Sequence, residues 1–435
     1  MDFAHFLLLM PFIVMIVLLL IGFPIAFSLL VSGVAGILIV TGNAKVMLNL
    51  VGMVAFDSVA NYTLTTVPMF ILMAFLASSG GLAEELFKAA SDWLGHLPGG
   101  LAIGTCVAVG IFGAMSGVSM AAATVMTQVA LPQMRRMGYS DILSAGVVGV
   151  GATTDVLIPP SVGMVIYGIA TETSIGKLLL AGIVPGVIVL IFLSILILVW
   201  VGIRPQDAPK FPRVPWPERW RSLWRVWPSV FLIVMIMGLL YAGICTPTEV
   251  GALGAFLAGV LGVLFGKLRW GGIVQAIKMT IGSTAMIFMI LIGAFTFGDF
   301  MALSGVPQKV MAFASAMEIN RWFIMIGIVV GYFVISMFMD ELPLMLITLQ
   351  LTFPLIVSLK FDPIWFGIMN MMMVMMGLVF PPVGMIAFVV SAVSKIPLHR
   401  VYTGTSILML AIVATTVLIC IWPEIVLWLP STMSK

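Results

Sequence analysis

Long apolar segments run through almost the whole chain and indicate its class. Stretches free of Asp, Glu, Lys and Arg cover residues 3–44, 93–134, 178–203, 226–248 and 363–394. A membrane-spanning helix needs roughly 20 apolar residues, so the pattern predicts about eleven spans and a pair of apolar segments too interrupted to be simple spans. With 62% hydrophobic and 9% charged residues, the chain is expected to be an all-α, multi-pass protein whose surface meets the lipid bilayer.

Two proline pairs, Pro159-Pro160 and Pro381-Pro382, interrupt these segments at corresponding places in the two halves. Each pair has a proline 27 residues upstream, Pro132 or Pro354, and a Val-Gly-Met sequence just after it. At membrane depth, broken backbone is tolerated only where it is buried in protein or lines a cavity. Paired interruptions in two halves indicate a transporter's binding site. The sequence therefore predicts two repeats, each with a re-entrant helical hairpin and a broken helix.

Loop charge bears on the orientation of the repeats and on the linker between them. The turn at 133–138 holds Arg135-Arg136, whereas its counterpart at 355–361 holds only Lys360. This asymmetry favours inverted repeats, although parallel repeats stay possible from charge alone. The polar, Arg-rich interval after residue 203 predicts a cytoplasmic amphipathic linker with tryptophans on one face. We expect N-terminal scaffold helices at 1–92, a first hairpin and broken helix at 93–203, and the linker at 204–226. In the second half we expect scaffold helices at 227–320, a second hairpin and broken helix at 321–403, and a C-terminal helix at 404–435.

The two expected hairpin tips carry polar groups inside apolar sequence. The first, Gly113–Ser119, combines small residues with two hydroxyls, and unpaired carbonyls and hydroxyls at such a tip can bind Na⁺. A helix-packing face of small residues is the alternative. The second tip carries Asp340 and Glu341. An acid inside a membrane segment indicates a functional site, and a solvated loop between two spans is the alternative.

The broken helices differ in their side-chain oxygens. Prolines free the carbonyls that precede them, and Thr153, Thr154 and Asp155 add hard oxygens before Pro159. The matching stretch at 376–382 has none. Asp155 therefore has three possible roles: it ligates a cation, holds a proton, or caps the second half-helix.

Other chemistries are excluded or disfavoured by residue type and spacing. The three cysteines are far apart in apolar segments and read as small buried residues. The methionines of 369–376 have no Cys or His beside them and read as packing residues. The chain has no P-loop and no basic aromatic face, so ATP is not a direct energy source and nucleic acid is not a partner. An intramembrane aspartyl protease would need two close carboxylates in a context that Asp340 lacks, so we expect no enzyme activity.

Taken in order, several motifs resemble the large membrane subunit of TRAP (tripartite ATP-independent periplasmic) transporters over nearly the whole chain. They are Val67–Met73, Gly113–Gly117, Leu157–Ser161 through Tyr167-Gly168, Ala181–Gly186, Thr246–Glu249, Phe338–Asp340, Phe361–Pro363 through Pro381–Gly384, and Trp422–Pro430.

This resemblance implies a Na⁺-driven importer of organic acids in the bacterial inner membrane that works by an elevator mechanism. It also implies a small four-helix membrane subunit and a periplasmic substrate-binding protein as partners. The chain departs from the family pattern in having Asp155 for Gly, Phe380 for Thr, and no Asn near Met373. A self-sufficient Na⁺/dicarboxylate or ion-exchange carrier of related hairpin architecture is the alternative.

These observations lead to two sets of expected site residues. For Na⁺ they are Ser116, Gly117, Gly151, Asp155, Met339, Asp340 and Gly377. For the substrate they are Ser116, Ser119, Thr153, Thr154, Pro159, Pro160, Pro381 and Pro382.

Overall fold

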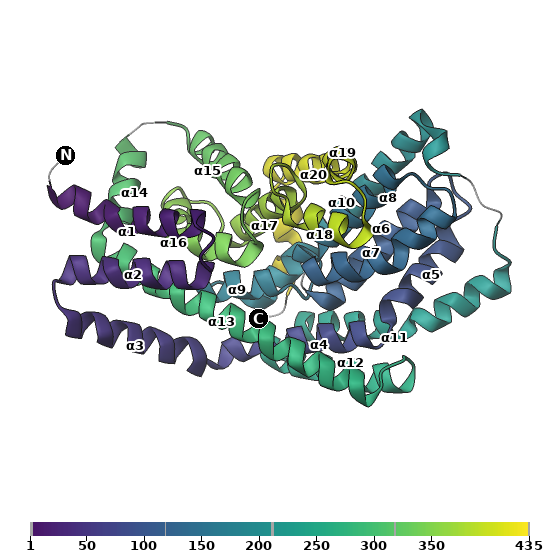
Figure 1. Ribbon diagram of the computed structural model, residues 1–435, viewed down its shortest axis with the longest axis horizontal. Helices are drawn as coiled ribbons and strands as arrows, with labels where there is room; N and C mark the ends of the chain where they lie inside the picture. Colours follow the sequence, from purple (N-terminus) through teal and green to yellow (C-terminus); the bar gives the residue numbers. More distant parts are fainter. Residues whose placement is uncertain (1–2, 118, 210–212, 317–318, 434–435) are drawn as a thin grey trace.

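The computed structural model describes residues 3–117, 119–209, 213–316 and 319–433, and over these residues it consists of helices and connecting turns with no strand (Figure 1). The all-α prediction is confirmed. Within the described ranges, seven helices are long and apolar enough to cross a membrane, and further apolar helices are only 10–17 residues long. The expected eleven spans thus include segments that Pro and Gly divide into shorter helices.

The first part of the chain forms one packed group together with helices from its middle. Helix α13, the longest with 35 residues, packs against α2, α4 and α16, and α12 packs against α4. In Figure 1, α1–α3 lie at one end of the molecule and α5 with α11 near the other. The helices of this group are α1 (Phe3–Leu20), α2 (Ile25–Thr41), α3 (Ala44–Ala60), α4 (Thr66–Ser79), α5 (Leu82–Leu94), α11 (Trp216–Tyr241), α12 (Pro247–Leu264), α13 (Trp270–Ser304) and α14 (Val306–Ala316), with the 3-10 turn η1 (Tyr62–Thr65).

The remaining helices form two series with the same order of elements. Each has a helical hairpin followed by a helix that is broken at a proline pair. The first series is α6 (Gly100–Ser116), α7 (Ser119–Arg136), α8 (Asp141–Ala152), the 3-10 turn η2 (Thr153–Val156), α9 (Val162–Ala170) and α10 (Ile175–Ile203), followed by η3 (Pro205–Asp207). The second is α15 (Arg321–Ser336), α16 (Glu341–Ser358), α17 (Pro363–Val379), α18 (Met385–Ser394), α19 (Leu398–Leu408), α20 (Leu410–Ile421) and α21 (Glu424–Ser431). Hairpins and breaks lie where the sequence predicts them, whereas inversion and re-entry into the membrane stay predictions.

Small residues let helices of this protein approach closely, as is common in membrane proteins. A Cβ added at Gly33 of α2 would lie 2.7 Å from the backbone nitrogen of Phe297 in α13. Gly146 of α8 faces Gly404 of α19 in the same way. The second contact joins the first series to the second.

Helix α11 begins inside the expected linker and continues without a break past residue 226 into the apolar segment. Trp216 and Trp220 near its start make edge contacts with Trp93 of α5, at ring separations of 6.1 and 5.9 Å. Both remain more than half exposed. The tryptophan face is therefore present, and α5 supports it.

At the start of α12 the sequence specifies its own cap. The Thr246 hydroxyl accepts the Glu249 N–H at 3.3 Å, and the Glu249 carboxylate accepts the Thr246 N–H at 2.8 Å. This reciprocal pair is a capping box. It places Glu249 in a structural role.

Candidate substrate and ion site

Hairpin tips and helix breaks lie next to each other in both series. At the first tip, Gly117 has the left-handed φ of 57°, and a Cβ there would lie 3.1 Å from the Pro160 carbonyl oxygen. At the second, the Gly384 N–H donates to the Met337 carbonyl at 3.1 Å. Each tip therefore touches the break of its own series. The Ser116 side chain, expected at the first tip, lies outside the described part of the structure.

Asp155 lies in η2 and is almost completely buried, with 1% of its surface exposed. The Ser119 hydroxyl, at the start of α7, donates to its Oδ1 at 2.5 Å. Gly113 of α6 makes room for it, since a Cβ there would lie 2.8 Å from the Asp155 Cβ. The other carboxyl oxygen, Oδ2, is buried without a hydrogen-bond partner. The cap of α9 is Ser161, whose hydroxyl accepts the Met164 N–H at 3.4 Å, so Asp155 does not cap that half-helix.

Asp340 and Glu341 lie at the N-terminus of α16. Asp340 is the N-cap, and its carboxylate accepts the Glu341 N–H at 2.9 Å. The Glu341 carboxyl lies against Gly163 in the first turn of α9, where a Cβ would overlap it. Its Oε1 is buried without a hydrogen-bond partner. The second hairpin therefore places an acid beside the broken helix of the first series.

The three acids Asp155, Asp340 and Glu341 lie close enough to act on one another electrostatically. Among the described residues, however, no group of three or more His, Cys, Asp or Glu side chains could hold a metal ion together. A hard monovalent cation at this place would therefore need hydroxyl and carbonyl oxygens as well. The unpartnered Asp155 Oδ2 and the tip of the first hairpin fit such a donor set.

Thr153 and Thr154 bind their own helix. Their hydroxyls donate to the carbonyls of Val150 and Gly151 at 2.8 and 2.6 Å. The Gly151 carbonyl, expected to face Na⁺, thus already accepts a hydroxyl. Both threonines are fully buried at the end of α8.

The second break is held by side chains from neighbouring helices. The Tyr402 hydroxyl of α19 lies 2.9 and 2.7 Å from the carbonyl oxygens of Pro382 and Val383. The Thr405 hydroxyl donates to Val379 O at 2.8 Å. Ser336 packs against Gly377 and donates to the Met373 carbonyl at 3.1 Å. These contacts were not anticipated, because Ser336, Tyr402 and Thr405 lie far from Pro381 in the sequence.

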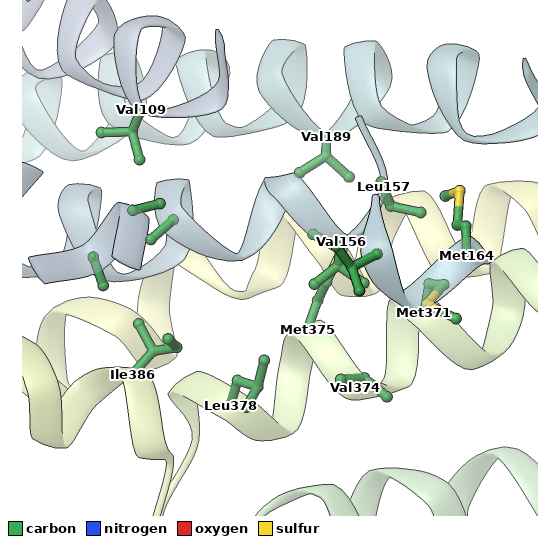
Figure 2. Close-up of a cluster of buried hydrophobic side chains, with 14 of the residues drawn as sticks. Val109, Val156, Leu157, Met164, Val189, Met371, Val374, Met375, Leu378 and Ile386 are labelled. Carbon is green, nitrogen blue, oxygen red and sulfur yellow. The ribbon is translucent and has the colours of Figure 1, made fainter. Parts of the chain in front are cut away.

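Apolar side chains fill the space between the two broken helices. Figure 2 shows Val156 of the first break beside Met375 of α17, with Met371 further along the same helix, while Leu157 lies on the side of α10, next to Gly186. These methionines are fully buried, which confirms their packing role. Asn370, just before this run, is 2% exposed and lies beside Tyr332. The expected lack of an amide near Met373 is thus wrong, because Asn370 supplies one a turn earlier.

A cavity of about 570 Å³ lies between the two hairpin tips and helices α4 and α13. Gly117 and Ser119 of the first hairpin, Gly163 of α9, and Asp340 and Glu341 of the second line one side. Helices α4 and α13 supply the opposite side, through residues that include Ser78, Ser79, Gln275 and Ser283. Gly151, Thr153, Thr154, Asp155, Pro159, Pro160, Met339, Gly377, Pro381 and Pro382 are not among the lining residues. The site roles of all expected residues stay predictions.

Sequence relatives cover almost the whole chain. The family model of the tripartite ATP-independent periplasmic transporter, DctM component, matches residues 12–425. The sialic acid TRAP transporter large permease protein SiaM of Vibrio cholerae is 30% identical over 94% of this chain and 95% of its own length. The ectoine TRAP transporter large permease protein TeaC of Halomonas elongata is 32% identical over 95% and 97%, respectively. The C4-dicarboxylate large permease DctM of Pseudomonas aeruginosa is 30% identical over 86% and 88%.

A solved structure agrees with the fold. The crystal structure of the Alcanivorax borkumensis YdaH transporter superposes with a TM-score of 0.66 at 14% identity, covering 88% of this chain and 90% of that one. The seven apolar helices found in the described part of the chain, together with the permease relatives, make it a multi-pass bacterial membrane protein. The chain belongs to the family of large permease (DctM) components of tripartite ATP-independent periplasmic transporters.

Proposed function

We propose that this chain is the large membrane subunit of a Na⁺-driven importer of an organic acid, located in the bacterial inner membrane. The observation that carries the proposal is the cavity at the two hairpin tips, where Ser119, Asp340 and Glu341 meet broken backbone. Helix breaks that line a cavity are typical of transporter binding sites. The relatives named for sialic acid, ectoine and C4-dicarboxylates support the substrate class.

Na⁺ fits the oxygen chemistry at the tips and breaks. The residues that would hold it are Ser116 and Gly117 at the first tip, Gly151 and Asp155 at the first break, and Met339, Asp340 and Gly377 in the second series. Bound Na⁺ supplies positive charge among the acids. The chain's own part is to hold Asp155 through Ser119 and to orient Asp340 through the N-terminus of α16.

Movement is proposed to follow the division between hairpins and scaffold. The cavity has hairpin residues on one side and α4 and α13 on the other. If the hairpins and broken helices slide as a body against α4 and α13, a substrate at the tips is carried across the membrane. This is the elevator mechanism.

Two partners are proposed, a small membrane subunit and a periplasmic substrate-binding protein. One relative, the isethionate TRAP transporter permease protein DctMQ of Oleidesulfovibrio alaskensis, matches 92% of this chain over 63% of its own length. The remaining part of that relative has room for an additional membrane segment. That additional part supports the proposal that this chain works together with a small membrane component.

The test is uptake by proteoliposomes that contain the chain, the small subunit and the loaded binding protein, with and without a Na⁺ gradient. Asp340→Ala should abolish Na⁺-dependent uptake and leave membrane insertion intact, because it removes the carboxylate at the second tip. Glu424→Ala, an exposed acid at the start of α21, is the matched control and should transport normally. Unchanged Na⁺ dependence in Asp340→Ala removes Asp340 from the site. Uptake by the purified chain alone favours the self-sufficient carrier instead.

A further inference from the structure

The charged side chains that line the cavity are all acidic. Its described lining contains two carboxylates, Asp340 and Glu341, and no Lys, Arg or His. The other polar groups are hydroxyls and amides, including Ser119, Thr124 and Gln128 of α7. Neutral groups of these kinds can donate to a carboxylate, but none can offset the two acids.

Two basic residues of the described chain are paired with acids that do not line the cavity. Arg135 pairs with Asp141 at 2.6 Å, and Lys267 pairs with Glu84 at 2.7 Å. Lys278 lies on α13 near the cavity in sequence, yet it is not among the lining residues. No Lys, Arg or His of the described cavity lining therefore balances the charges of Asp340 and Glu341.

Two buried carboxyl oxygens at this place have no hydrogen-bond donor. One is Oε1 of Glu341, which lines the cavity and lies against Gly163. The other is Oδ2 of Asp155, which lies behind Ser119 and outside the cavity lining, so a ligand in the cavity would meet Glu341. Burying an ionised carboxylate without a partner is strongly unfavourable. The N-terminus of α9 beside Glu341 offers partial positive charge, which compensates only in part. A ligand that brings a cationic N–H or N-alkyl group would supply the missing counter-charge.

We propose that the substrate bound in this cavity carries a cationic nitrogen group, such as an ammonium or amidinium, and that Glu341 selects it. The inference rests on the proposed transport function and names the substrate class within it: a zwitterionic organic acid. A dicarboxylate would place a second negative charge against Asp340 and Glu341, where like charges repel. If Na⁺ binds at Asp340, it offsets that residue and leaves Glu341 as the anionic contact.

The sign of the field can be measured on the purified full-length chain without knowing the substrate. A cysteine introduced by Ser283→Cys or, independently, by Thr124→Cys lies in the cavity lining. Modification rates are compared for two methanethiosulfonate reagents of similar size, one with a trimethylammonium and one with a sulfonate group. The unmodified chain gives the background of its native cysteines, and Ser431→Cys, at an exposed position, gives the reference ratio.

We expect the cation-to-anion rate ratio at both cavity positions to exceed the reference roughly fivefold, in K⁺ as well as in Na⁺ medium. Adding Glu341→Gln should lower that ratio at least about threefold, since one charge is removed at nearly constant shape. A ratio at or below the reference at both positions overturns the proposal. The two introduced cysteines lie on different helices, so if one variant fails to fold, the rate ratio can still be measured with the other.

Ligand class is tested by thermal stabilisation of the same purified chain. The probes are ectoine, glycine betaine and γ-aminobutyrate against succinate, malate and fumarate. We expect the largest rise in melting temperature from a probe with a cationic nitrogen, and loss of that rise in Glu341→Gln. The proposal is overturned if a dicarboxylate gives the largest rise in melting temperature. It is also overturned if every probe with a cationic nitrogen raises the melting temperature of the wild type no more than that of Glu341→Gln. Because no gradient or partner is involved, these outcomes are independent of whether uptake requires Na⁺.

Discussion

Gly146→Ala tests the contact by which α8 of the first series packs on α19 of the second. A Cβ at Gly146 would lie 2.6 Å from the Gly404 carbonyl carbon, 2.8 Å from its oxygen and 2.9 Å from its Cα. Non-bonded carbon atoms prefer about 3.5–4.0 Å, so the helices must separate by roughly 1 Å. The obstacle is backbone, which cannot rotate away as a side chain can.

Such overpacking costs about 1–3 kcal/mol. Alanine in a helix interior recovers up to about 1 kcal/mol relative to glycine, so we expect a net loss of roughly 1–2 kcal/mol. Helix α8 leads into η2 and Asp155, and α19 carries Tyr402 and Thr405 to the second break. The separation should therefore also disturb both helix breaks and reduce uptake.

The assay is the melting temperature of the purified chain in detergent, followed by tryptophan fluorescence, together with uptake in the assembled transporter. Gly282→Ala is the matched control: it lies inside α13, and a Cβ there meets no atom within 4 Å. It should melt at or above the wild-type temperature, because only helix propensity changes. If Gly146→Ala melts as high as Gly282→Ala, α8 and α19 are not in close contact and the argument fails.

Two further substitutions separate stability from site chemistry. Gly163→Ala should displace the Glu341 carboxyl, which is the end of a flexible side chain. We expect a smaller loss of stability than in Gly146→Ala but reduced uptake, with Gly259→Ala as the control, where a Cβ makes only ordinary contact at 3.6 Å. Normal uptake by Gly163→Ala would show that the position of Glu341 is unimportant. Asp155→Asn keeps the size of the side chain and an acceptor for the Ser119 hydroxyl but removes the charge, so we expect a weaker dependence of uptake on Na⁺ at nearly unchanged melting temperature. An unaltered Na⁺ titration would place Asp155 outside the ion site.

Local chemistry in the sequence was sufficient for the class and for the position of each irregularity. Apolar length predicts membrane helices because unpaired backbone is costly in hydrocarbon. Glycine and proline set where helices end, as at Gly117 and before Pro159. The capping box of Thr246 and Glu249 is likewise formed by residues within a four-residue segment. Each of these features depends on neighbours in the chain.

Only the tertiary structure decides which of the hairpin tips and helix breaks line the same cavity. The cavity takes its second side from α4 and α13, and no pattern in the sequence links their lining residues, such as Ser79 and Gln275, to the hairpin tips. Thr153 and Thr154 resemble ligands in sequence but turn to carbonyls of their own helix, while Asp155 meets Ser119 of another. Glu341 reaches Gly163 across nearly half of the chain. Such pairings follow from helix packing over long sequence separations, and hydropathy and local propensity carry no information about them.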